Sequence, residues 1–229
     1  MGIAWLGSFV DLIFPRQCSA CGDKLLAGEE EVCIPCLSDL PYLNSLWGQQ
    51  RGSGQSSLSA FIELDAQSLL EYEKSGRTQN LIHSFKYQGR KELAFYMGRH
   101  MGQKFGKYWK SLGVDAVVPV PLSPAKLKKR KYNQAERLAA GIERETGIIC
   151  LANFLLRTGI SESQTLKSRY ERWVNVQSVF TLNLSGNSPH HVLLVDDVIT
   201  TGSTIEACAA CIRSDLDCKV SACSLARTA

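Results

Sequence analysis

The sequence predicts an α/β fold with a parallel sheet that is flanked by helices. From about residue 60 onward, short apolar runs rich in β-branched residues alternate with longer segments whose apolar residues recur at helical spacing. The strand candidates are apolar almost throughout, which is typical of strands that are buried on both faces. With 229 residues, 45% of them hydrophobic, the chain is long enough for one main domain and a small appendage.

Three parts are expected along the chain. Residues 1–43 hold an apolar helix followed by a cysteine-rich knuckle, and residues 44–59, rich in Gly, Ser and Gln, indicate a linker or exposed loop. Residues 60–229 form the main domain. Its strand candidates, in order, are residues 61–64, 114–122, 148–151, 179–184, 191–195 and 220–226. Its helices are expected over residues 91–109, 134–146 and 203–214.

Composition and charge exclude several classes of protein. The chain has 26 Lys and Arg against 22 Asp and Glu, and this formal net charge of +4 matters only where it is clustered. No apolar run is long enough to span a membrane. The apolar start, residues 1–14, lacks a basic segment and is interrupted by Asp11, so it does not predict a signal peptide. We therefore expect a cytoplasmic protein.

Two CxxC pairs near the start predict a metal site. Each pair can offer two thiolates from one tight turn, and two such pairs at short separation supply the four ligands of tetrahedral zinc: Cys18, Cys21, Cys33 and Cys36. Because all four positions would be protein ligands, the zinc would be structural rather than catalytic. A third pair, Cys208 and Cys211, falls within a helical pattern and is interpreted as buried thiols.

The segment from His191 to Thr204 carries the clearest chemistry. An apolar strand is expected to end at Val195, with the carboxylates of Asp196 and Asp197 at its carboxyl end, where ligands of parallel sheets bind. A turn rich in hydroxyl groups follows and opens a helix: Thr200, Thr201, Gly202, Ser203 and Thr204. Such a turn directs N–H and hydroxyl groups at one point and predicts a phosphate site. The carboxylates would then face sugar hydroxyls or Mg²⁺. The structural alternative is an ordinary capped strand end with solvated carboxylates.

The same residues resemble a known family. The stretch DDVITTGST resembles the phosphoribosyl pyrophosphate (PRPP) signature of type I phosphoribosyltransferases, and nearly the whole chain resembles the ComF/GntX family of competence-associated proteins. The matching motifs are Phe14-Pro15 before Cys18, Phe85-Lys86-Tyr87-Gln88-Gly89, Pro119–Leu122, Arg130 with Asn133–Glu136, and Arg157, Gln164, Arg172, Asn175 and Val176. Two features depart from the family pattern: no further CxxC pair follows the first two, and Lys131 stands where Gly commonly follows the Arg.

The resemblance implies a type I phosphoribosyltransferase-like fold and a role in natural transformation, with PRPP, incoming single-stranded DNA and DNA-uptake proteins as partners. The turn from Thr200 to Thr204 would hold the 5-phosphate of PRPP. Asp196 and Asp197 would hold the ribose hydroxyls directly or through Mg²⁺. The pyrophosphate would lie near a second strand end and a basic loop: Val120, Pro121, Leu122, Ser123, Arg130 and Lys131. No general base can be named, so phosphoribosyl transfer to an unknown acceptor and non-catalytic PRPP sensing both stay open.

The strongest charge cluster allows three interpretations. Five of the six residues from Lys126 to Lys131 are basic. The cluster forms a solvated face, a basic loop over the site, or a contact for single-stranded DNA in which Tyr132 stacks on a base. The residues for DNA contact would be Lys126, Lys128, Lys129, Arg130, Lys131 and Tyr132. A third overall hypothesis is a zinc-stabilised interaction protein whose phosphate turn has lost its function.

Overall fold

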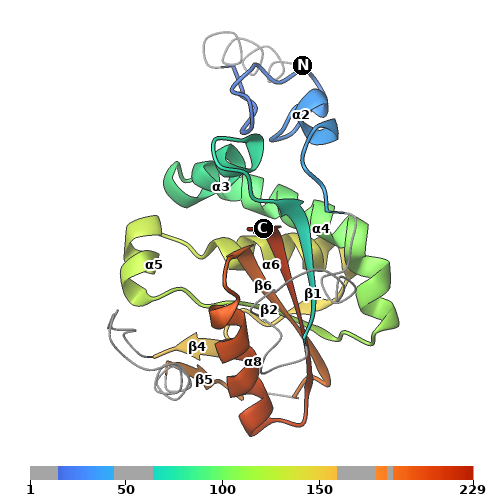
Figure 1. Ribbon diagram of the computed structural model, residues 1–229, viewed down its shortest axis with the longest axis vertical. Helices are drawn as coiled ribbons and strands as arrows, with labels where there is room; N and C mark the ends of the chain where they lie inside the picture. Colours follow the sequence, from blue (N-terminus) through green and yellow to red (C-terminus); the bar gives the residue numbers. More distant parts are fainter. Residues whose placement is uncertain (1–14, 44–63, 159–178, 185–187, 229) are drawn as a thin grey trace, which may run out of the picture.

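A five-stranded, wholly parallel sheet forms the centre of the molecule, in the strand order β1-β7-β6-β2-β3 (Figure 1). The structure is a computed structural model, and it describes residues 15–43, 64–158, 179–184 and 188–228. The strands are β1 (Asp65–Glu71), β2 (Ala116–Pro119), β3 (Ile149–Cys150), β6 (His191–Ile199) and β7 (Lys219–Arg227). The predicted α/β class with a parallel sheet is therefore confirmed.

Three helices cover one face of this sheet. They are α3 (Arg77–Tyr87), α4 (Lys91–Ser111) and α6 (Gln134–Thr146). Their apolar residues pack against the sheet in one hydrophobic cluster, in which Phe85 and Trp109 are fully buried. Helices α4 and α6 cross at glycines. A Cβ at Gly98 would lie 2.1 Å from the carbonyl oxygen of Leu138, and one at Gly141 would lie 2.2 Å from that of Phe95.

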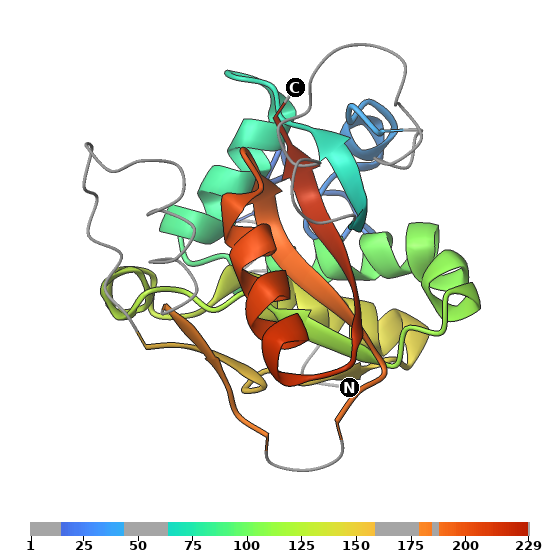
Figure 2. The same cartoon turned by 60° about the horizontal axis from the view of Figure 1, so that its bottom comes forward.

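The opposite face carries a second, smaller cover. Helix α8 (Ser203–Asp215) lies along β6 and β7, as Figure 2 shows. Beside it, β4 (Leu155–Arg157) and β5 (Phe180–Leu182) pair as a separate two-stranded antiparallel sheet. The buried residues of this face form a cluster of their own, distinct from that under α3, α4 and α6. Both faces of the parallel sheet are thus covered, which explains why its strands are apolar throughout.

The cysteine-rich knuckle, which includes α2 (Ile34–Ser38), lies over α3 and α4 (Figure 1). Two side chains of the main domain bind its backbone: Asn80 donates to the carbonyl of Ala20 at 2.9 Å, and Arg90 donates to that of Gln17 at 3.0 Å. The buried residues of the knuckle continue the same hydrophobic cluster as α3 and α4. The knuckle therefore packs on the helical layer through both polar and apolar contacts.

Most predicted elements are present, with instructive differences. The strand expected at residues 61–64 begins instead at Asp65, and residues 61–63 lie outside the described part. The strand expected to end at Val195 continues to Ile199, because its ladder with β7 runs on to Ile199 and Arg227. Pairing with β7 outweighs the low strand propensity of aspartate. Helix α3, the short helix α5 (Pro124–Arg130) and β4 were not predicted.

Some predictions fall outside the described residues, namely the first helix within residues 1–14, the linker at 44–59, and Gln164, Arg172, Asn175 and Val176. Among the helices that the structure describes, none is long and apolar enough to cross a membrane.

Candidate functional site

The hydroxyl-rich turn connects β6 to α8 at the carboxyl edge of the sheet. Gly202 precedes the first helical residue and has φ +76°, a left-handed conformation that glycine adopts without strain. No side chain of the described residues caps this helix, so the N–H groups of its first turn keep their donor capacity. The hydroxyls of Thr201 and Ser203 lie 3.1 Å apart, and Thr200, Thr201, Ser203 and Thr204 are all exposed. This turn has the free donors and the helix polarity that an anion requires.

The two adjacent carboxylates lie inside the strand rather than beyond its end. Successive side chains of a strand point to opposite faces. Asp197 shares the face of Leu193 and Val195, which pack in the cluster under α3, α4 and α6, whereas Asp196 shares the face of Leu194, which packs under α8. They remain neighbours through the backbone, because the N–H of Asp197 donates to Oδ1 of Asp196 at 2.7 Å. The expected pair of carboxylates beyond the strand end is thus corrected to two carboxylates on opposite faces.

Asp197 is the centre of a small ion cluster. Lys86, in the last turn of α3, places Nζ 2.8 Å from Oδ1 of Asp197. Arg130, at the end of α5, places Nη1 4.0 Å from Oδ2 of the same carboxylate and 2.9 Å from Oε1 of Gln134. The three charged side chains are largely buried, with exposed fractions of 16% for Lys86, 12% for Arg130 and 11% for Asp197. Two cations therefore converge on one carboxylate.

Asp196 has an unusual protonation equilibrium. Burial, followed by the negative charge of Asp197, raises the pKa of Asp196 to about 7. The hydrogen bond from the N–H of Asp197 and the charges of Lys86 and Lys126 oppose this rise. Asp196 consequently changes its charge near neutral pH.

The segment from Val120 to Ser123 leaves the sheet beside Val195 of β6. The N–H of Val120 donates to the carbonyl of Val195 at 2.9 Å, directly before Asp196. Asn133 anchors this segment from the other side: its Nδ2 donates to the carbonyl of Val120 at 3.0 Å, and its Oδ1 accepts from Ala135 N at 3.1 Å at the start of α6. The two strand ends that the sequence singled out are therefore neighbours in the structure.

The basic segment forms the short helix α5, which begins after Ser123. The side chain of Ser123 accepts from the N–H of Lys126 at the helix start. Four basic side chains of this segment are exposed: Lys126, Lys128, Lys129 and Lys131. Lys131 ends the helix with φ +67°, the left-handed conformation that favours glycine. In the family pattern Gly commonly follows the Arg. In this chain that position is Lys131, and its backbone has the left-handed conformation that glycine adopts most easily.

Two tyrosines lie near the basic helix. The hydroxyl of Tyr132 donates to the carbonyl of Phe85, and the side chain is half-buried. Tyr87 is 56% exposed, and its ring has Lys129 Nζ and the guanidinium carbon of Arg130 each 5.8 Å from its centroid. Tyr87, rather than Tyr132, therefore presents the more accessible aromatic ring beside the basic residues.

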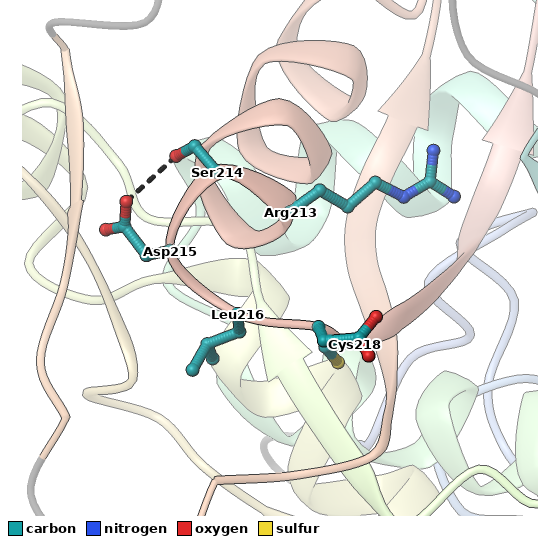
Figure 3. Close-up of a pocket in the computed structure, with 6 residues that line it drawn as sticks. Arg213, Ser214, Asp215, Leu216 and Cys218 are labelled. Atoms are coloured by element: carbon teal, nitrogen blue, oxygen red, sulfur yellow. Dashed lines mark hydrogen bonds between the residues drawn. The ribbon is translucent and has the colours of Figure 1, made fainter.

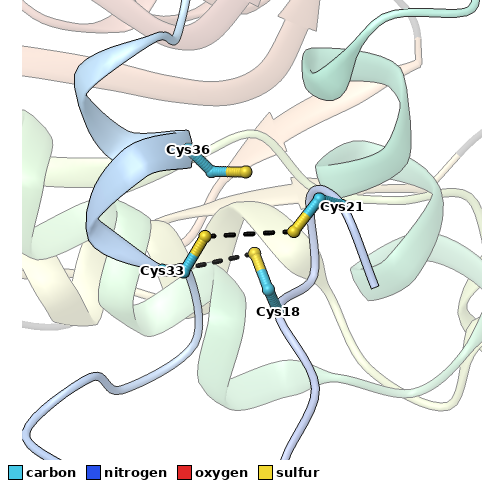
Figure 4. Close-up of side chains that lie close together, drawn as sticks. All are labelled: Cys18, Cys21, Cys33 and Cys36. Carbon is cyan, nitrogen blue, oxygen red and sulfur yellow. Dashed lines mark hydrogen bonds between the residues drawn. The ribbon is translucent and has the colours of Figure 1, made fainter. Parts of the chain in front are cut away.

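The four predicted zinc ligands converge (Figure 4). The sulfur atoms of Cys18, Cys21, Cys33 and Cys36 all lie within 4.8 Å of one another, and those of Cys21 and Cys33 are 3.9 Å apart. Zinc–sulfur bonds of about 2.3 Å place tetrahedral ligands roughly 3.8 Å apart, so a small contraction closes this set around a metal. The cluster can hold a metal ion.

Backbone N–H groups donate hydrogen bonds to the sulfur atoms of this cluster. Ala20 and Cys33 donate to Sγ of Cys18 at 3.4 Å and 3.3 Å, and Asp23 donates to Sγ of Cys21 at 3.5 Å. Burial raises the pKa of Cys18, but these N–H groups, that of Cys33 foremost, outweigh it and bring the pKa to about 7. Burial raises the pKa of Cys36. One thiol is thus close to its ionised form before any metal binds, and binding would release the remaining protons.

A shallow pocket formed by Arg213 to Cys218 lies away from these residues (Figure 3). It is at the end of α8 and the start of β7, the edge of the sheet opposite the hydroxyl-rich turn. Ser214 donates to the carboxylate of Asp215 there at 3.0 Å. The pocket includes none of the site residues that the sequence indicated.

Lys86 is a site residue whose role the sequence does not indicate. It belongs to the motif Phe85-Lys86-Tyr87-Gln88-Gly89, which contributes to the family resemblance without assigning a function to the lysine. Placing Lys86 in the site would have required a prediction of α3. No side-chain cap marks the start of that helix in the sequence. The contact with Asp197, 111 positions away, depends on tertiary packing.

Comparison with known proteins supports a common origin with competence proteins. The chain is 35% identical over 130 residues to Competence protein F of Haemophilus influenzae, covering 55% of this chain and 57% of that protein. It is 30% identical over 128 residues to the DNA utilization protein YhgH of Escherichia coli K12, covering 55% and 56%. It is 26% identical over 200 residues to Competence protein ComFC of Bacillus subtilis, covering 82% and 80%.

The chain is a homologue of these proteins. This relationship confirms the resemblance to the ComF/GntX family that the motifs indicated. The chain spans little more than half the length of Competence protein F and YhgH in these matches. No family model matches the chain.

Solved structures give a weaker likeness. A glutamine PRPP amidotransferase from Bacillus subtilis, complexed with ADP and GMP, matches with a TM-score of 0.43 and 16% identity, over 62% of this chain and 30% of that one. A structure described as the allosteric regulatory enzyme of purine biosynthesis matches with a TM-score of 0.42 and 18% identity, over the same shares of the two chains.

Proposed function

We propose that the protein is a phosphoribosyltransferase-like member of the competence proteins that binds PRPP with Mg²⁺ and acts in the handling of incoming DNA. The observation that carries this proposal is the convergence of three features at one edge of the sheet. These features are the uncapped hydroxyl-rich turn, the carboxylates of Asp196 and Asp197, and the segment from Val120 to Ser123. PRPP has a 5-phosphate, ribose hydroxyls and a diphosphate, and each of these three groups needs one of these features as its partner. The relatives named for competence and DNA utilization support the process.

Each part of the ligand has a proposed partner. The turn from Thr200 to Thr204 holds the 5-phosphate through its N–H and hydroxyl groups. Asp197 and Asp196 accept hydrogen bonds from the ribose hydroxyls or hold Mg²⁺, whose preferred ligands are oxygen atoms. The segment Val120, Pro121, Leu122 and Ser123, with Arg130 and Lys131, takes the pyrophosphate. Mg²⁺, when bound, would neutralise charge on the pyrophosphate.

Binding of PRPP can be measured as a shift in melting temperature. At a ligand concentration 100-fold above Kd, PRPP with Mg²⁺ should add about 2.7 kcal/mol of stability, which is roughly 5 to 10 °C for a protein of this size. Asp197→Asn should abolish the shift, because the carboxylate at the centre of the site is removed. Asp217→Asn, an exposed position at the opposite edge of the sheet, should retain it. An undiminished shift in Asp197→Asn would contradict the site assignment.

Turnover is a separate matter from binding. The described residues around the turn include no side chain that we assign as a general base, so the acceptor is not identified. Release of pyrophosphate from PRPP in the presence of candidate acceptors, single-stranded DNA among them, distinguishes a transferase from a PRPP-sensing module.

We propose that the four cysteines bind zinc in a structural role. All four positions are protein thiols, and the knuckle packs on α3 and α4 rather than on the hydroxyl-rich turn. The division into a zinc-binding part at residues 1–43, a linker at 44–59 and a main domain at 60–229 remains part of this proposal.

A second candidate function, contact with single-stranded DNA, is favoured by the surface of α5. Lys126, Lys128 and Lys129 are exposed on α5 and Lys131 directly after it, and the exposed ring of Tyr87 lies beside Lys129. Cations next to an accessible aromatic ring are what single-strand binding uses for phosphates and bases. The half-buried ring of Tyr132 is less suited to stacking than that of Tyr87.

A further inference from the structure

The ion cluster around Asp197 contains more positive than negative charge. Lys86 and Arg130 both approach the single carboxylate of Asp197, Lys86 at 2.8 Å and Arg130 at 4.0 Å. The other carboxylate nearby, Asp196, is held partly protonated near neutral pH. Charged side chains that are withdrawn from water are costly unless they are fully paired. Among the described residues, two cations therefore share the one close carboxylate of Asp197.

The geometry indicates which cation is not yet satisfied. Lys86 Nζ has a close partner in Asp197, whereas the guanidinium of Arg130 lies at the outer limit of an ion pair and donates one hydrogen bond to the neutral oxygen of Gln134. An arginine makes its strongest contacts in a bidentate arrangement with a carboxylate or phosphate. A ligand phosphate next to Arg130 would complete this arrangement, and it would lie within reach of the second cation.

The position of the two cations indicates which phosphate they would meet. Lys86 and Arg130 come from α3 and α5, on the face of the sheet that Asp197 shares, and α5 directly follows the segment from Val120 to Ser123. The hydroxyl-rich turn instead leads into α8, which covers the opposite face. The turn has its own N–H and hydroxyl donors for the 5-phosphate. The two cations are thus placed on the side where the diphosphate would lie.

We propose that Lys86 binds the diphosphate of the ligand together with Arg130, and that in the ligand-free protein Asp197 occupies the place of that diphosphate as the counter-ion of Lys86. When the ligand binds, Lys86 moves from the carboxylate to a phosphate oxygen. Asp197 is thereby released to accept from the ribose hydroxyls. This inference rests on the proposed function, and it adds an exchange of partners by which binding of the diphosphate frees the carboxylate for the sugar.

The exchange can be tested with inorganic pyrophosphate in the absence of Mg²⁺, measured by calorimetry on the full chain. Lys86→Met should weaken pyrophosphate binding roughly 10- to 100-fold, the effect of removing one charged hydrogen bond. Binding of ribose 5-phosphate, which tests the turn, should not weaken, because Asp197 is no longer held by Lys86. Lys110→Met, an exposed lysine at the end of α4, is the matched control and should leave both affinities unchanged.

Asp197→Asn separates ligand binding from a merely structural ion pair. If Lys86 exchanges partners, removing the competing carboxylate should leave pyrophosphate affinity equal to or tighter than that of the wild type. If the ion pair only holds the fold, Asp197→Asn should weaken pyrophosphate as much as Lys86→Met does, and the inference is overturned. The double variant Lys86→Met with Asp197→Asn, which removes both charges of the 2.8 Å ion pair, should bind pyrophosphate as weakly as Lys86→Met and serves where the single variant does not fold.

The outcomes also separate this inference from the proposed function. Wild-type protein that gives a PRPP shift, together with Lys86→Met that binds pyrophosphate normally, overturns the role of Lys86 and leaves the PRPP site intact. Wild-type protein that binds neither PRPP nor pyrophosphate overturns the proposed function itself. A loss of ribose 5-phosphate binding in Lys86→Met, with pyrophosphate binding retained, overturns the assignment of Lys86 to the diphosphate.

Discussion

Asp196 and Asp197 are consecutive residues with identical side chains, yet the structure gives them different environments. Asp197 lies 2.8 Å from Nζ of Lys86 and 4.0 Å from Nη1 of Arg130. Asp196, on the other face of β6, is partly buried next to that charge, and its pKa rises to about 7. Strand alternation underlies the difference, because it places adjacent residues under different helices.

The raised pKa of Asp196 predicts a pH-dependent effect of Asp196→Asn. Between its usual pKa of 3.8 and about 7, the unfolded chain loses this proton while the folded protein keeps it. The contribution of this group to stability therefore falls as pH rises through that window and is constant above it. Removing the carboxyl group should stabilise the protein by up to about 4 kcal/mol at pH 8 and by less than about 1 kcal/mol at pH 4.

Chemical denaturation at several pH values measures this difference. The variant keeps an oxygen that can accept from the N–H of Asp197, so the local hydrogen bond is preserved. Asp217→Asn, at an exposed position, should show no comparable trend. A stability difference between Asp196→Asn and wild type that does not change with pH would argue against the raised pKa.

At the scale of elements, the crossing of α4 and α6 depends on glycines. Gly98 and Gly141 let the two backbones approach so closely that a methyl group has no room, with carbonyl oxygens 2.1 and 2.2 Å from the position of a Cβ. Asn133, the N-cap of α6, donates to the carbonyl of Val120, and α4 follows α3, which carries Lys86. The close crossing therefore sets the distance between two parts of the site.

Gly141→Ala should destabilise the protein by about 3 kcal/mol, because the clash is with backbone rather than with a flexible side chain. Unfolding in denaturant measures the loss. Lys107→Ala, an exposed helix position on α4, should change stability by less than about 0.5 kcal/mol. If Gly141→Ala is as stable as the wild type, the helices are further apart than the structure places them.

The knuckle is the second element whose integrity can be tested. Cys33→Ser should lose the bound zinc, from one equivalent per chain to none, because the replacement leaves three thiolate ligands. Metal analysis of protein purified without chelator measures this. Cys150→Ser, a thiol outside the cluster, should retain one equivalent. Absence of zinc from the wild type would refute the structural zinc site.

At the scale of the whole molecule, Arg130 links the basic helix α5 to the ligand site. It is the last residue of α5, and its guanidinium approaches Asp197. The exposed lysines of α5 continue outward from the residue that reaches Asp197. A single strand bound along α5 would therefore lie beside the site proposed for PRPP. This arrangement predicts that DNA contact and ligand binding are neighbouring functions of one surface.

Single-strand binding should weaken when Lys128, Lys129 and Lys131 are changed to alanine, because fewer phosphates are then neutralised. The dependence of log K on log salt should become shallower by about 0.7 for each phosphate that no longer meets a lysine. Tyr87→Ala should weaken binding further at constant salt slope, by roughly 1 to 3 kcal/mol for a stacked base. Tyr132→Phe, which keeps the ring, is the control and should bind normally. Binding that is absent or independent of salt would remove DNA from the proposal.

How much could be predicted from the sequence depended on whether the signal was local. Apolar runs predicted most of the sheet, and helical spacing predicted α4, α6 and α8. Both signals are local, because the residues that a strand or a helix face buries lie close together in the sequence. The spacing of the cysteines predicted their convergence. The predicted end of β6 was wrong, because the ladder with β7 extends the strand past the charges.

The sequence by itself determined the fold class, the convergence of the four thiols and the residues of the hydroxyl-rich turn, because each depends on short-range pattern. Only the tertiary structure decided that Asp196 and Asp197 face different layers, that Lys86 meets Asp197 and that Tyr87 is more exposed than Tyr132. These depend on how α3, α5 and β6 meet in space. Packing brings together residues far apart in the chain, and their charges and burial then set the chemistry of the site.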